Sequence, residues 1–274
     1  MSKNQKYLSR NEWNSLSDEE KNRIICEIRD TYSKFGVQRN GNIRVKVSFY
    51  TKYGKRMLDI SISLLALIVT LPLNLFIMII TFFDVGSPII FKQERIGKDG
   101  KQFNIYKFRN MTNEKDENGN LLPPTQRVTA WGRFVRKTSL DELLNFWSIL
   151  KGDMSVIGPR PLLKQYLNRY NSFHMQRHLV KPGLECPFHD SSLAKLGWDG
   201  RFENDIWYVE NLSFSTDIKM FFLLIKKVLS KKERSESANG EVGEFLGYDV
   251  KMKVIDETNI PIEYINNSKE VELV

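Results

Sequence analysis

The chain has 274 residues, of which 41% are hydrophobic and 12% aromatic. This length and composition are enough to bury a hydrophobic core, and they suit one domain with additions at both ends. Its formal net charge of +8 predicts an anionic partner, such as lipid headgroups or a phosphorylated small substrate. Nucleic acid is disfavoured because no finger, homeodomain-like or aromatic RNA-binding signature accompanies the basic residues. Cys26 and Cys186 are far apart, which argues against a disulfide framework or a zinc site, and the polar residues 1–10 give no sign of a signal peptide.

Two segments precede the first long apolar stretch. Ser17 and Glu20 form a capping-box pattern, and apolar residues recur on one face until Gly36, which predicts an amphipathic helix. This helix is expected to dock on the body of the protein or on a partner, with simple docking favoured. Residues 38–53 are basic and alternate with apolar residues, which predicts a short strand or a surface arm.

Residues 57–83 are the most apolar stretch, long enough at about 1.5 Å per residue to cross a hydrocarbon core of about 30 Å. Pro72 lies at its middle, where it removes a helix hydrogen bond and bends the segment. Basic residues flank both ends, so the positive-inside rule places both on the cytosolic side. We therefore predict a re-entrant membrane helix over 51–86 that breaks at Leu71 and Pro72, with a kinked spanning helix as the alternative. The flanking basic residues are Lys52, Lys55, Arg56, Lys92, Arg95, Lys98 and Lys101.

A β-hairpin is predicted after this stretch. Residues 88–96 and 102–108 are strand-like, and the Asp-Gly pair within 98–101 is a hairpin signal. On the second strand Lys107 and Arg109 share a face by the period of two. These two cations, at the end of an apolar face, are placed to bind a phosphate. The simpler interpretation is that they lie at the end of the strand and are exposed to solvent.

Two adjacent carboxylates, Asp141 and Glu142, stand among several cations. Ser139 and Glu142 form a second capping-box pattern, which predicts that a helix begins here and continues to Leu150. Asp141 then lies in the first turn, where a helix N-terminus stabilises negative charge, and an ionised carboxylate is a usable nucleophile. The cations that would bind a polyanion at the same helix end are Arg133, Arg136, Lys137 and Arg160.

Two further helices are predicted towards the C-terminus. Residues 161–181 contain an amphipathic helix in which His174 and His178 are spaced for zinc, but no third ligand is in view, so packing is favoured. Residues 207–225 are apolar and aromatic and precede a lysine cluster, which suits a helix lying in an anionic membrane surface, with a buried core helix as the alternative.

The C-terminal tail has a different character. Residues 230–244 are charged and contain glycine and serine, as a linker does. Strand-like pieces follow at 248–255 and 260–265, separated by a turn at 256–259. The sequence assigns no purpose to this tail.

Several of these strings together resemble the bacterial sugar transferases, the monotopic phosphoglycosyl transferases that start the assembly of membrane-bound glycans. The resemblance covers roughly residues 52 to 230. Its strongest strings are Ser-Leu-Asp-Glu-Leu at 139–143 and Lys-Gly-Asp-Met-Ser-Val-Ile-Gly-Pro-Arg-Pro at 151–161. Supporting strings are Gln-Glu-Arg-Ile-Gly at 93–97, Tyr-Lys-Phe-Arg at 106–109 and Asp-Ile-Trp-Tyr-Val at 205–209.

With this resemblance we expect an α+β monotopic membrane protein with a re-entrant membrane helix, a small β-hairpin or sheet and amphipathic interfacial helices. The expected regions are an N-terminal extension over 1–50, the membrane helix over 51–86, a cytosolic catalytic domain over 87–230 and a linker with a C-terminal extension over 231–274. The expected location is the cytoplasmic membrane of a bacterial cell, with the catalytic domain on the cytosolic face.

The resemblance also implies a reaction: transfer of a sugar 1-phosphate from a UDP-sugar to undecaprenyl phosphate or a related polyprenyl phosphate, with release of UMP, as the first membrane step of capsule, exopolysaccharide or glycoprotein glycan synthesis. By the resemblance, Asp141 is the nucleophile of a covalent intermediate, and Glu142 assists through a metal ion or proton handling. A diphosphate substrate and paired carboxylates call for Mg²⁺, held by Asp141 and Glu142. The phosphate-binding candidates are Lys107, Arg109, Arg133, Arg136 and Arg160.

The expected partners are the UDP-sugar, the polyprenyl phosphate and membrane lipids, with a second copy of the chain or downstream glycosyltransferases as further candidates.

The alternative function is a noncatalytic membrane scaffold that recruits glycan-assembly proteins through its extensions. The concentration of charge at Asp141, Glu142 and Arg160 argues against a scaffold, because such charge is costly to keep.

The chain departs from the family pattern at two main places, and more mildly at Leu144 and Asn145, where Pro-Gln is frequent. Leu71 precedes Pro72 where many members have serine, which removes a hydroxyl that would satisfy a freed carbonyl. Residues 184–189 replace a frequent Ile/Leu-Thr-Gly-Trp string. The nucleotide and sugar pocket is therefore less defined by the sequence than the phosphate chemistry.

Overall fold

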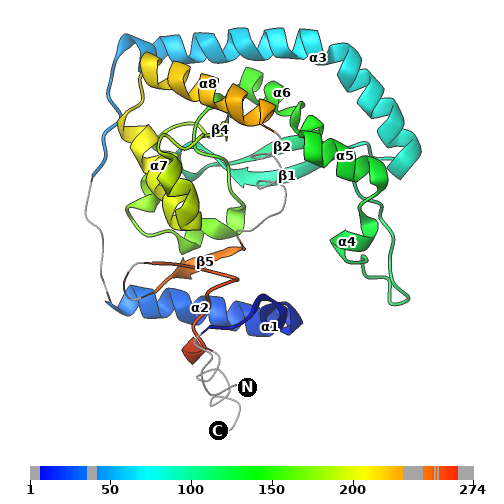
Figure 1. Cartoon of the computed structure of the whole chain (residues 1–274), viewed down its shortest axis with the longest axis vertical. Coiled ribbons are helices and arrows are strands. Elements are labelled where there is room, and N and C mark those ends of the chain that lie inside the picture. Colours follow the sequence, from blue (N-terminus) through cyan, green and yellow to red (C-terminus); the bar gives the residue numbers. More distant parts are fainter. Residues whose placement is uncertain (1–6, 36–41, 231–242, 250, 252, 265–274) are drawn as a thin grey trace.

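The computed structural model describes residues 7–35, 42–230, 243–249, 251 and 253–264. Helices and three two-stranded sheets alternate along this part of the chain, so the α+β expectation is confirmed (Figure 1). The N-terminal half contains α1 (Arg10–Ser15), α2 (Asp18–Phe35), η1 (Tyr50–Gly54), α3 (Lys55–Val85), β1 (Ile90–Ile96), η2 (Lys98–Gly100), β2 (Gln102–Phe108), α4 (Pro124–Arg127) and α5 (Ala130–Thr138). The remainder contains η3 (Leu140–Glu142), α6 (Asn145–Lys151), β3 (Ser155–Ile157), η4 (Lys164–Arg169), η5 (His174–Leu179), β4 (Gly183–Glu185), η6 (Ser191–Leu196), α7 (Gly197–Glu210), α8 (Phe214–Leu229), β5 (Phe245–Tyr248) and β6 (Val254–Asp256).

The predicted hairpin is confirmed as the antiparallel pair of β1 and β2. Its register runs from Ile90 opposite Phe108 to Ile96 opposite Gln102. The turn at η2 places Asp99 and Gly100 at positive φ, which is why the chain has an Asp-Gly pair there. The buried face of β2 packs into the main core, and Lys107 points towards the turn that carries the carboxylates.

A short parallel pair, β3 with β4, brings two distant loops together. Ser155 lies opposite Gly183, and the two backbones approach so closely that a Cβ on Gly183 would lie 2.2 Å from the amide nitrogen of Gly158. Only glycine fits at such a contact. This approach sets the segment that follows β3, which contains Arg160, beside the end of β4.

The apolar stretch forms one helix, α3, that bends between two arms (Figure 1). The helix continues through Pro72, so the break expected at Leu71 and Pro72 is not observed. Both arms are attached to the same body. Arg56, in the first arm, donates hydrogen bonds of 2.6 and 2.7 Å to the last carbonyls of α6. In the second arm, Thr81 accepts a hydrogen bond of 3.1 Å from the indole of Trp131 in α5. Both arms of α3 are therefore anchored to the part of the chain that contains α5 and α6.

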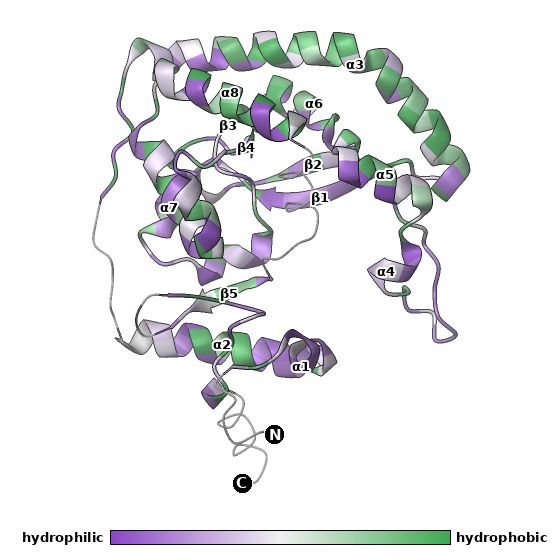
Figure 2. Cartoon of the chain, in the orientation of Figure 1, coloured by the Kyte–Doolittle hydropathy of each residue, from purple (hydrophilic) through white to green (hydrophobic). Residues whose placement is uncertain are grey.

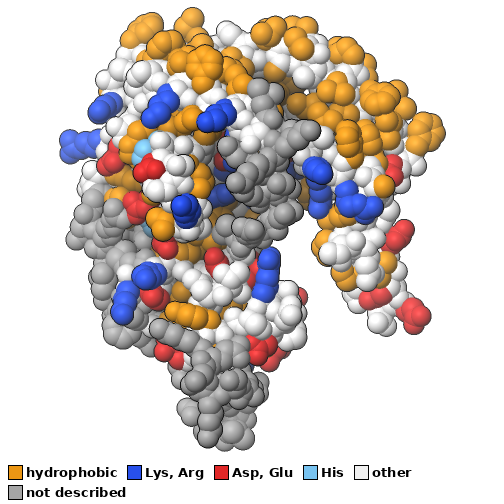
Figure 3. Space-filling model, in the orientation of Figure 1, with side chains coloured by type: hydrophobic (Ala, Val, Ile, Leu, Met, Phe, Trp, Pro, Cys, Tyr) orange, Lys and Arg blue, Asp and Glu red, His pale blue; other side chains and the backbone are white. Residues whose placement is uncertain are grey.

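A large apolar surface remains exposed on α3 and on α8. The helix from Tyr50 to Val85 is long and apolar enough to cross a membrane, and little of it is buried in the protein. Figure 2 shows α3 hydrophobic along most of its length, and Figure 3 shows hydrophobic side chains gathered over it. On α8, Met220 is fully buried whereas Phe222 is 64% exposed, so this helix is amphipathic rather than buried in the core. The exposed apolar residues of α8 are Phe214, Ile218, Phe222, Ile225 and Val228.

The segment over 161–181 is not the predicted α-helix. It forms the two 3₁₀ segments η4 and η5, because Asn171 interrupts it and its side chain accepts a hydrogen bond of 2.6 Å from the amide of His174. His174 hydrogen-bonds the Tyr248 hydroxyl at 2.8 Å, and His178 hydrogen-bonds the Gly97 carbonyl at 3.1 Å. The two histidines thus have separate packing roles, as favoured from the sequence.

The two extensions pack against each other. The capping box of Ser17 and Glu20 begins α2 as predicted, although the helix end expected at Gly36 lies outside the described residues. The tail contributes β5 and β6 and the predicted turn after Asp256, but the piece expected as a strand at 260–265 ends in a helical turn. Most of the linker over 230–244 also lies outside the described residues. The shared core comprises Leu8, Trp13, Ile24, Ile28, Leu246, Ile255, Ile260 and Tyr264.

The basic segment before α3 is an extended arm where the structure describes it, from residue 42 to residue 48, rather than a strand. The side chain of Ile43 is buried in the main core, and its amide donates a hydrogen bond of 2.6 Å to Gln176. The segment is therefore an extended and mostly exposed arm, as in one of the two expected forms, but Ile43 anchors it in the core.

Candidate active site

The carboxylate pair lies in a turn between two helices, not at the start of one. Ser139 takes a left-handed conformation (φ 58°) and caps the C-terminus of α5 through its backbone amide. Residues 140–142 form the 3₁₀ turn η3, and α6 begins only at Asn145. The predicted capping box of Ser139 and Glu142 is therefore wrong. The physical reason is that the Ser139 amide donates to the last carbonyls of α5, while the Glu142 carboxylate binds Lys107 and Arg160 instead.

Glu142 is the centre of an ion-pair cluster. Its Oε1 accepts hydrogen bonds of 2.7 Å from Nζ of Lys107 and 2.7 Å from Nη2 of Arg160. Burial opposes ionisation of this carboxyl, but Arg160 and Lys107 outweigh it and lower the pKa of Glu142 to about 2. Glu142 is therefore an anion across the physiological pH range.

Asp141, its neighbour, has the opposite electrostatic character. It is only 6% exposed, and its Oδ2 accepts a hydrogen bond of 3.3 Å from the Asn110 side chain. Burial raises the pKa of Asp141, while Lys107 and Arg136 act against the rise and the charge of Glu142 adds to it. The expectation that a helix N-terminus stabilises the Asp141 charge is wrong, because α6 begins four residues later. Two adjacent carboxyls with pKa values driven apart are typical of sites where they have different tasks.

Asn110 reaches Asp141 because α5 packs closely on the end of β2. A Cβ on Gly132, in α5, would lie 2.1 Å from the carbonyl oxygen of Asn110. Glycine at this position therefore allows the approach that brings Asn110 and Asp141 together. Asn110 was not predicted from the sequence, although this residue directly follows the Tyr-Lys-Phe-Arg string in which Lys107 was predicted.

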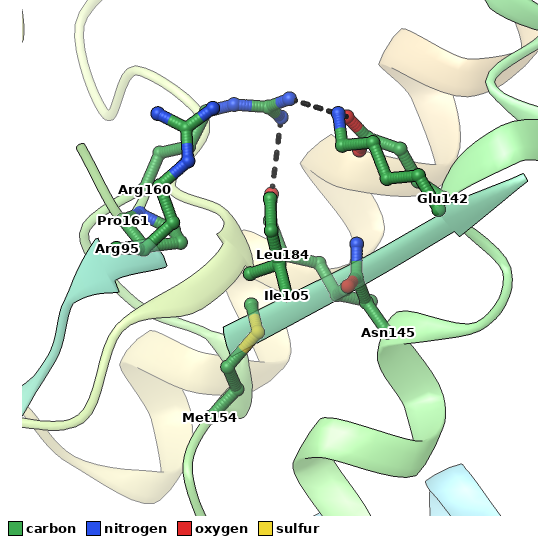
Figure 4. Close-up of a pocket in the computed structure, with 9 residues that line it drawn as sticks. Arg95, Ile105, Glu142, Asn145, Met154, Arg160, Pro161 and Leu184 are labelled. Atoms are coloured by element: carbon green, nitrogen blue, oxygen red, sulfur yellow. Dashed lines mark hydrogen bonds and ion pairs between the residues drawn. The ribbon is translucent and has the colours of Figure 1, made fainter. Parts of the chain in front are cut away.

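A pocket opens beside Glu142 between β2, α6 and the segment after β3. Three of its lining side chains are cations, and only Glu142 is an anion, so the pocket favours a negatively charged ligand. Figure 4 shows the guanidinium of Arg95 beside Arg160, whose own guanidinium extends towards Glu142. Burial and the charge of Arg160 lower the pKa of Arg95. The lining residues are Arg95, Ile105, Lys107, Glu142, Asn145, Met154, Arg160, Pro161 and Leu184.

The structure brings some of the predicted cations together and leaves others apart. Lys107 and Arg160 bind Glu142, and Arg136 is an exposed residue that favours ionisation of Asp141. Arg109 is buried and donates a hydrogen bond of 3.1 Å to the Ser87 carbonyl, outside the pocket lining. Arg133 is exposed and donates a hydrogen bond of 2.9 Å to the Val128 carbonyl. Neither arginine is placed to bind a phosphate in this pocket.

Asp141 and Glu142 are the two carboxylates that would hold the expected magnesium ion. Asp141 is a buried carboxylate whose hydrogen-bond donors, the Asn110 side chain and its own backbone amide, are neutral, so a cation would favour its charged form. Within the described part of the chain, no group of three or more His, Cys, Asp or Glu side chains is arranged to hold a metal ion. Mg²⁺ commonly binds through one or two carboxylates and completes its shell with substrate phosphates and water.

Comparison with known proteins places most of the chain in one family. The family model described as "Bacterial sugar transferase" matches residues 50–231. The chain is 44% identical over 175 residues to an uncharacterized sugar transferase, EpsL, of Bacillus subtilis, a match covering 64% of this chain and 87% of the relative. It is 35% identical over 198 residues to the undecaprenyl-phosphate galactose phosphotransferase of Salmonella typhimurium, covering 66% of this chain and 41% of the relative.

A third relative has a name of the same type. The UDP-glucose:undecaprenyl-phosphate glucose-1-phosphate transferase of Klebsiella pneumoniae is 38% identical over 190 residues, covering 63% of this chain and 39% of the relative. The match thus spans most of the Bacillus protein but about two fifths of the Salmonella and Klebsiella proteins.

Proposed function

The chain belongs to the bacterial sugar transferase family, and on that premise we propose that it transfers a sugar 1-phosphate from a UDP-sugar to polyprenyl phosphate, releasing UMP. Undecaprenyl phosphate is the acceptor in the names of two relatives. The observation that carries the proposal is the pair of carboxyls with opposed pKa shifts beside a pocket with three cations. The reaction would be the first membrane step of capsule, exopolysaccharide or glycoprotein glycan synthesis.

In the first step, the Asp141 carboxylate attacks the phosphorus next to the sugar. A bond forms from Asp141 to phosphorus, the bond from that phosphorus to the bridging oxygen breaks, and UMP leaves with the electron pair. In the second step, an oxygen of polyprenyl phosphate attacks the same phosphorus and releases Asp141 as a carboxylate. Two such displacements are typical of covalent catalysis by an acidic side chain.

The neighbours of Asp141 suit it to this role. Burial removes water from the carboxylate, while Lys107 and Arg136 favour the charged form that the attack requires. The cations of the pocket, Arg95, Lys107 and Arg160, would bind the negative phosphate oxygens as the bonds exchange.

Glu142 has an electrostatic role rather than a proton-transfer role in this proposal. With a pKa of about 2 it carries no proton at neutral pH, so it cannot donate one. It instead fixes the positions of Lys107 and Arg160 through one shared oxygen. A Mg²⁺ ion held by Asp141 and Glu142 would neutralise charge on the phosphate oxygens.

The membrane geometry supports the same reaction, because one substrate is soluble in water and the other keeps its chain in lipid. We infer that α3 is a re-entrant helix, since both of its arms attach to the body that carries the pocket. The exposed apolar faces of α3 and α8 would then lie in the cytosolic leaflet of the cytoplasmic membrane.

One assay tests the proposal against the scaffold alternative. The full chain, purified in detergent with Mg²⁺, is incubated with a panel of UDP-sugars, with and without undecaprenyl phosphate. We expect UMP and a lipid-linked sugar diphosphate from at least one donor. A scaffold would release no UMP from any donor under these conditions.

A further inference from the structure

Arg160 is held from two sides, and the second side was not expected from the sequence. Its Nη2 donates to Glu142 at 2.7 Å, while its Nη1 donates to the Leu184 carbonyl at 3.2 Å and to Oε2 of Glu185 at 3.3 Å. Figure 4 shows the guanidinium extended between Glu142 and Leu184. Because a guanidinium is planar, contacts to both of its amino groups fix the orientation of the whole plane.

Glu185 is itself held by a cation on another element. Nζ of Lys227, near the end of α8, lies 3.5 Å from the same Oε2 that binds Arg160. Burial opposes ionisation of Glu185, but Lys227 and Arg160 outweigh it, and the pKa of Glu185 is lowered. A chain of alternating charges therefore runs from α8 through Glu185 and Arg160 to Glu142.

The backbone determines this arrangement. Glu185 ends β4, whose close approach to the segment after β3 depends on Gly183, so Glu185 and Arg160 are brought side by side. Glu185 also lies in the string at 184–189, where the chain departs from the common family pattern. Arg160 is thus oriented by Glu185, a residue in the divergent string at 184–189 and not in the string at 151–161 that contains Arg160.

We propose that Glu185 is a positioning residue that orients Arg160 for the donor diphosphate and links α8 to the phosphate pocket. This inference rests on the proposed function, in which Arg160 binds a donor phosphate. Removing the Glu185 charge leaves Arg160 with Glu142 as its only anionic contact in the pocket, so the guanidinium turns towards Glu142 and is less available to the ligand.

The test is a double-mutant cycle on the binding of UDP, which holds both donor phosphates and needs no knowledge of the sugar. Affinity is measured calorimetrically, in detergent with Mg²⁺, for the unmodified chain, Glu185→Gln, Arg160→Gln and the double variant. We expect Glu185→Gln to weaken UDP binding about 10-fold in the unmodified background and less than about 2-fold when Arg160 is already replaced. Equal losses in both backgrounds would show that Glu185 acts without Arg160 and would overturn the proposal.

Two further variants separate positioning from folding. Glu210→Gln removes a carboxylate from the exposed end of α7 and should leave UDP affinity unchanged. Glu185→Asp keeps the charge but shortens the side chain, so it should fold normally and still weaken UDP binding. Unchanged affinity in Glu185→Asp and Glu185→Gln, with UDP bound normally by the unmodified chain, contradicts the inference alone. Failure of the unmodified chain to bind UDP contradicts the proposed function instead.

Discussion

At the scale of single residues, the site depends on two adjacent carboxyls in different surroundings. The adjacent Asp141 and Glu142 could be found from the sequence, as could Lys107 and Arg160, because each lies in a distinctive string. Their electrostatic states could not, since these depend on burial and on contacts between distant segments. Asn110 and Glu185 were missed for the same reason, because close backbone approaches at Gly132 and Gly183 bring them to the site.

Asp141→Asn should abolish activity without lowering stability. A carboxyl whose pKa is raised on folding costs stability at pH values above its unfolded pKa, and the cost disappears when the pH falls below that value. Asparagine removes this cost and can still accept the hydrogen bond from Asn110. We expect the melting temperature at pH 7.5 to be unchanged or higher and UMP release to fall at least about 1,000-fold. A lower melting temperature would show that the Asp141 charge stabilises the fold.

We expect the fall of kcat/KM at acid pH to result from protonation of Asp141. The raised pKa places loss of its charge above the usual aspartate range, whereas Glu142 stays ionised to about pH 2. Arg136 favours the ionised form, so Arg136→Gln should raise the Asp141 pKa further and move the acid limb of kcat/KM to higher pH. Arg133→Gln, on the same helix but bonded to the Val128 carbonyl, serves as the matched control. A limb that moves equally in both variants, or in neither, contradicts this assignment.

At the scale of elements, α3 was predicted in position, although it forms one continuous helix instead of breaking at Leu71 and Pro72. Its attachment through Arg56 and Trp131 could not be predicted, because those contacts join segments about 50 to 90 residues apart. The bend also carries its own polar groups. The Thr70 hydroxyl donates to the Ala66 carbonyl at 2.7 Å and accepts a hydrogen bond of 3.1 Å from Asn74. A hydroxyl is therefore present one residue before Leu71, where the departure from the family pattern had suggested its loss.

Cysteine labelling tests the topology inferred for α3. In a background without Cys26 and Cys186, single cysteines at the exposed positions Lys52 and Lys98 should both react only from the cytosolic side. The reason is that the two arms of α3 attach to one body. Labelling from opposite sides would show a spanning helix.

The Pro72→Ala variant tests whether the proline determines the topology of α3. Alanine restores a helix donor, so we expect a fraction of molecules to span the membrane and activity to fall. Unchanged topology in this variant would assign the geometry to the flanking charges and to the anchors on α5 and α6.

At the scale of the whole molecule, the two extensions form one packed unit against the catalytic body. The sequence predicted α2 and the turn after Asp256, but it gave no sign that these ends meet, because their contacts join the first and last parts of the chain. The C-terminal tail also packs against the part of the chain that precedes it. The Trp198 indole donates a hydrogen bond of 2.8 Å to the Gly243 carbonyl, and Phe245 packs among Tyr166, Trp198 and Phe202.

Leu246→Ala should therefore destabilise the chain while sparing the site. Leu246 is fully buried in the core shared by the two extensions, and truncation of such a leucine costs about 2–5 kcal/mol. We expect a lower melting temperature with unchanged UDP affinity at low temperature. Leu121→Ala, at an exposed position, should leave both unchanged. Loss of UDP affinity in folded Leu246→Ala would show that the extensions shape the pocket.

Attachment of the phosphosugar to Asp141 can be measured by incubating the enzyme with its donor in the absence of lipid acceptor. We expect release of UMP in an amount no greater than the enzyme present, a mass increase equal to one sugar phosphate, and mapping of that adduct to Asp141. Addition of undecaprenyl phosphate should remove the adduct and yield the lipid-linked sugar diphosphate. If no adduct and no UMP form until the lipid is added, or if the adduct maps to another residue, Asp141 is not the nucleophile.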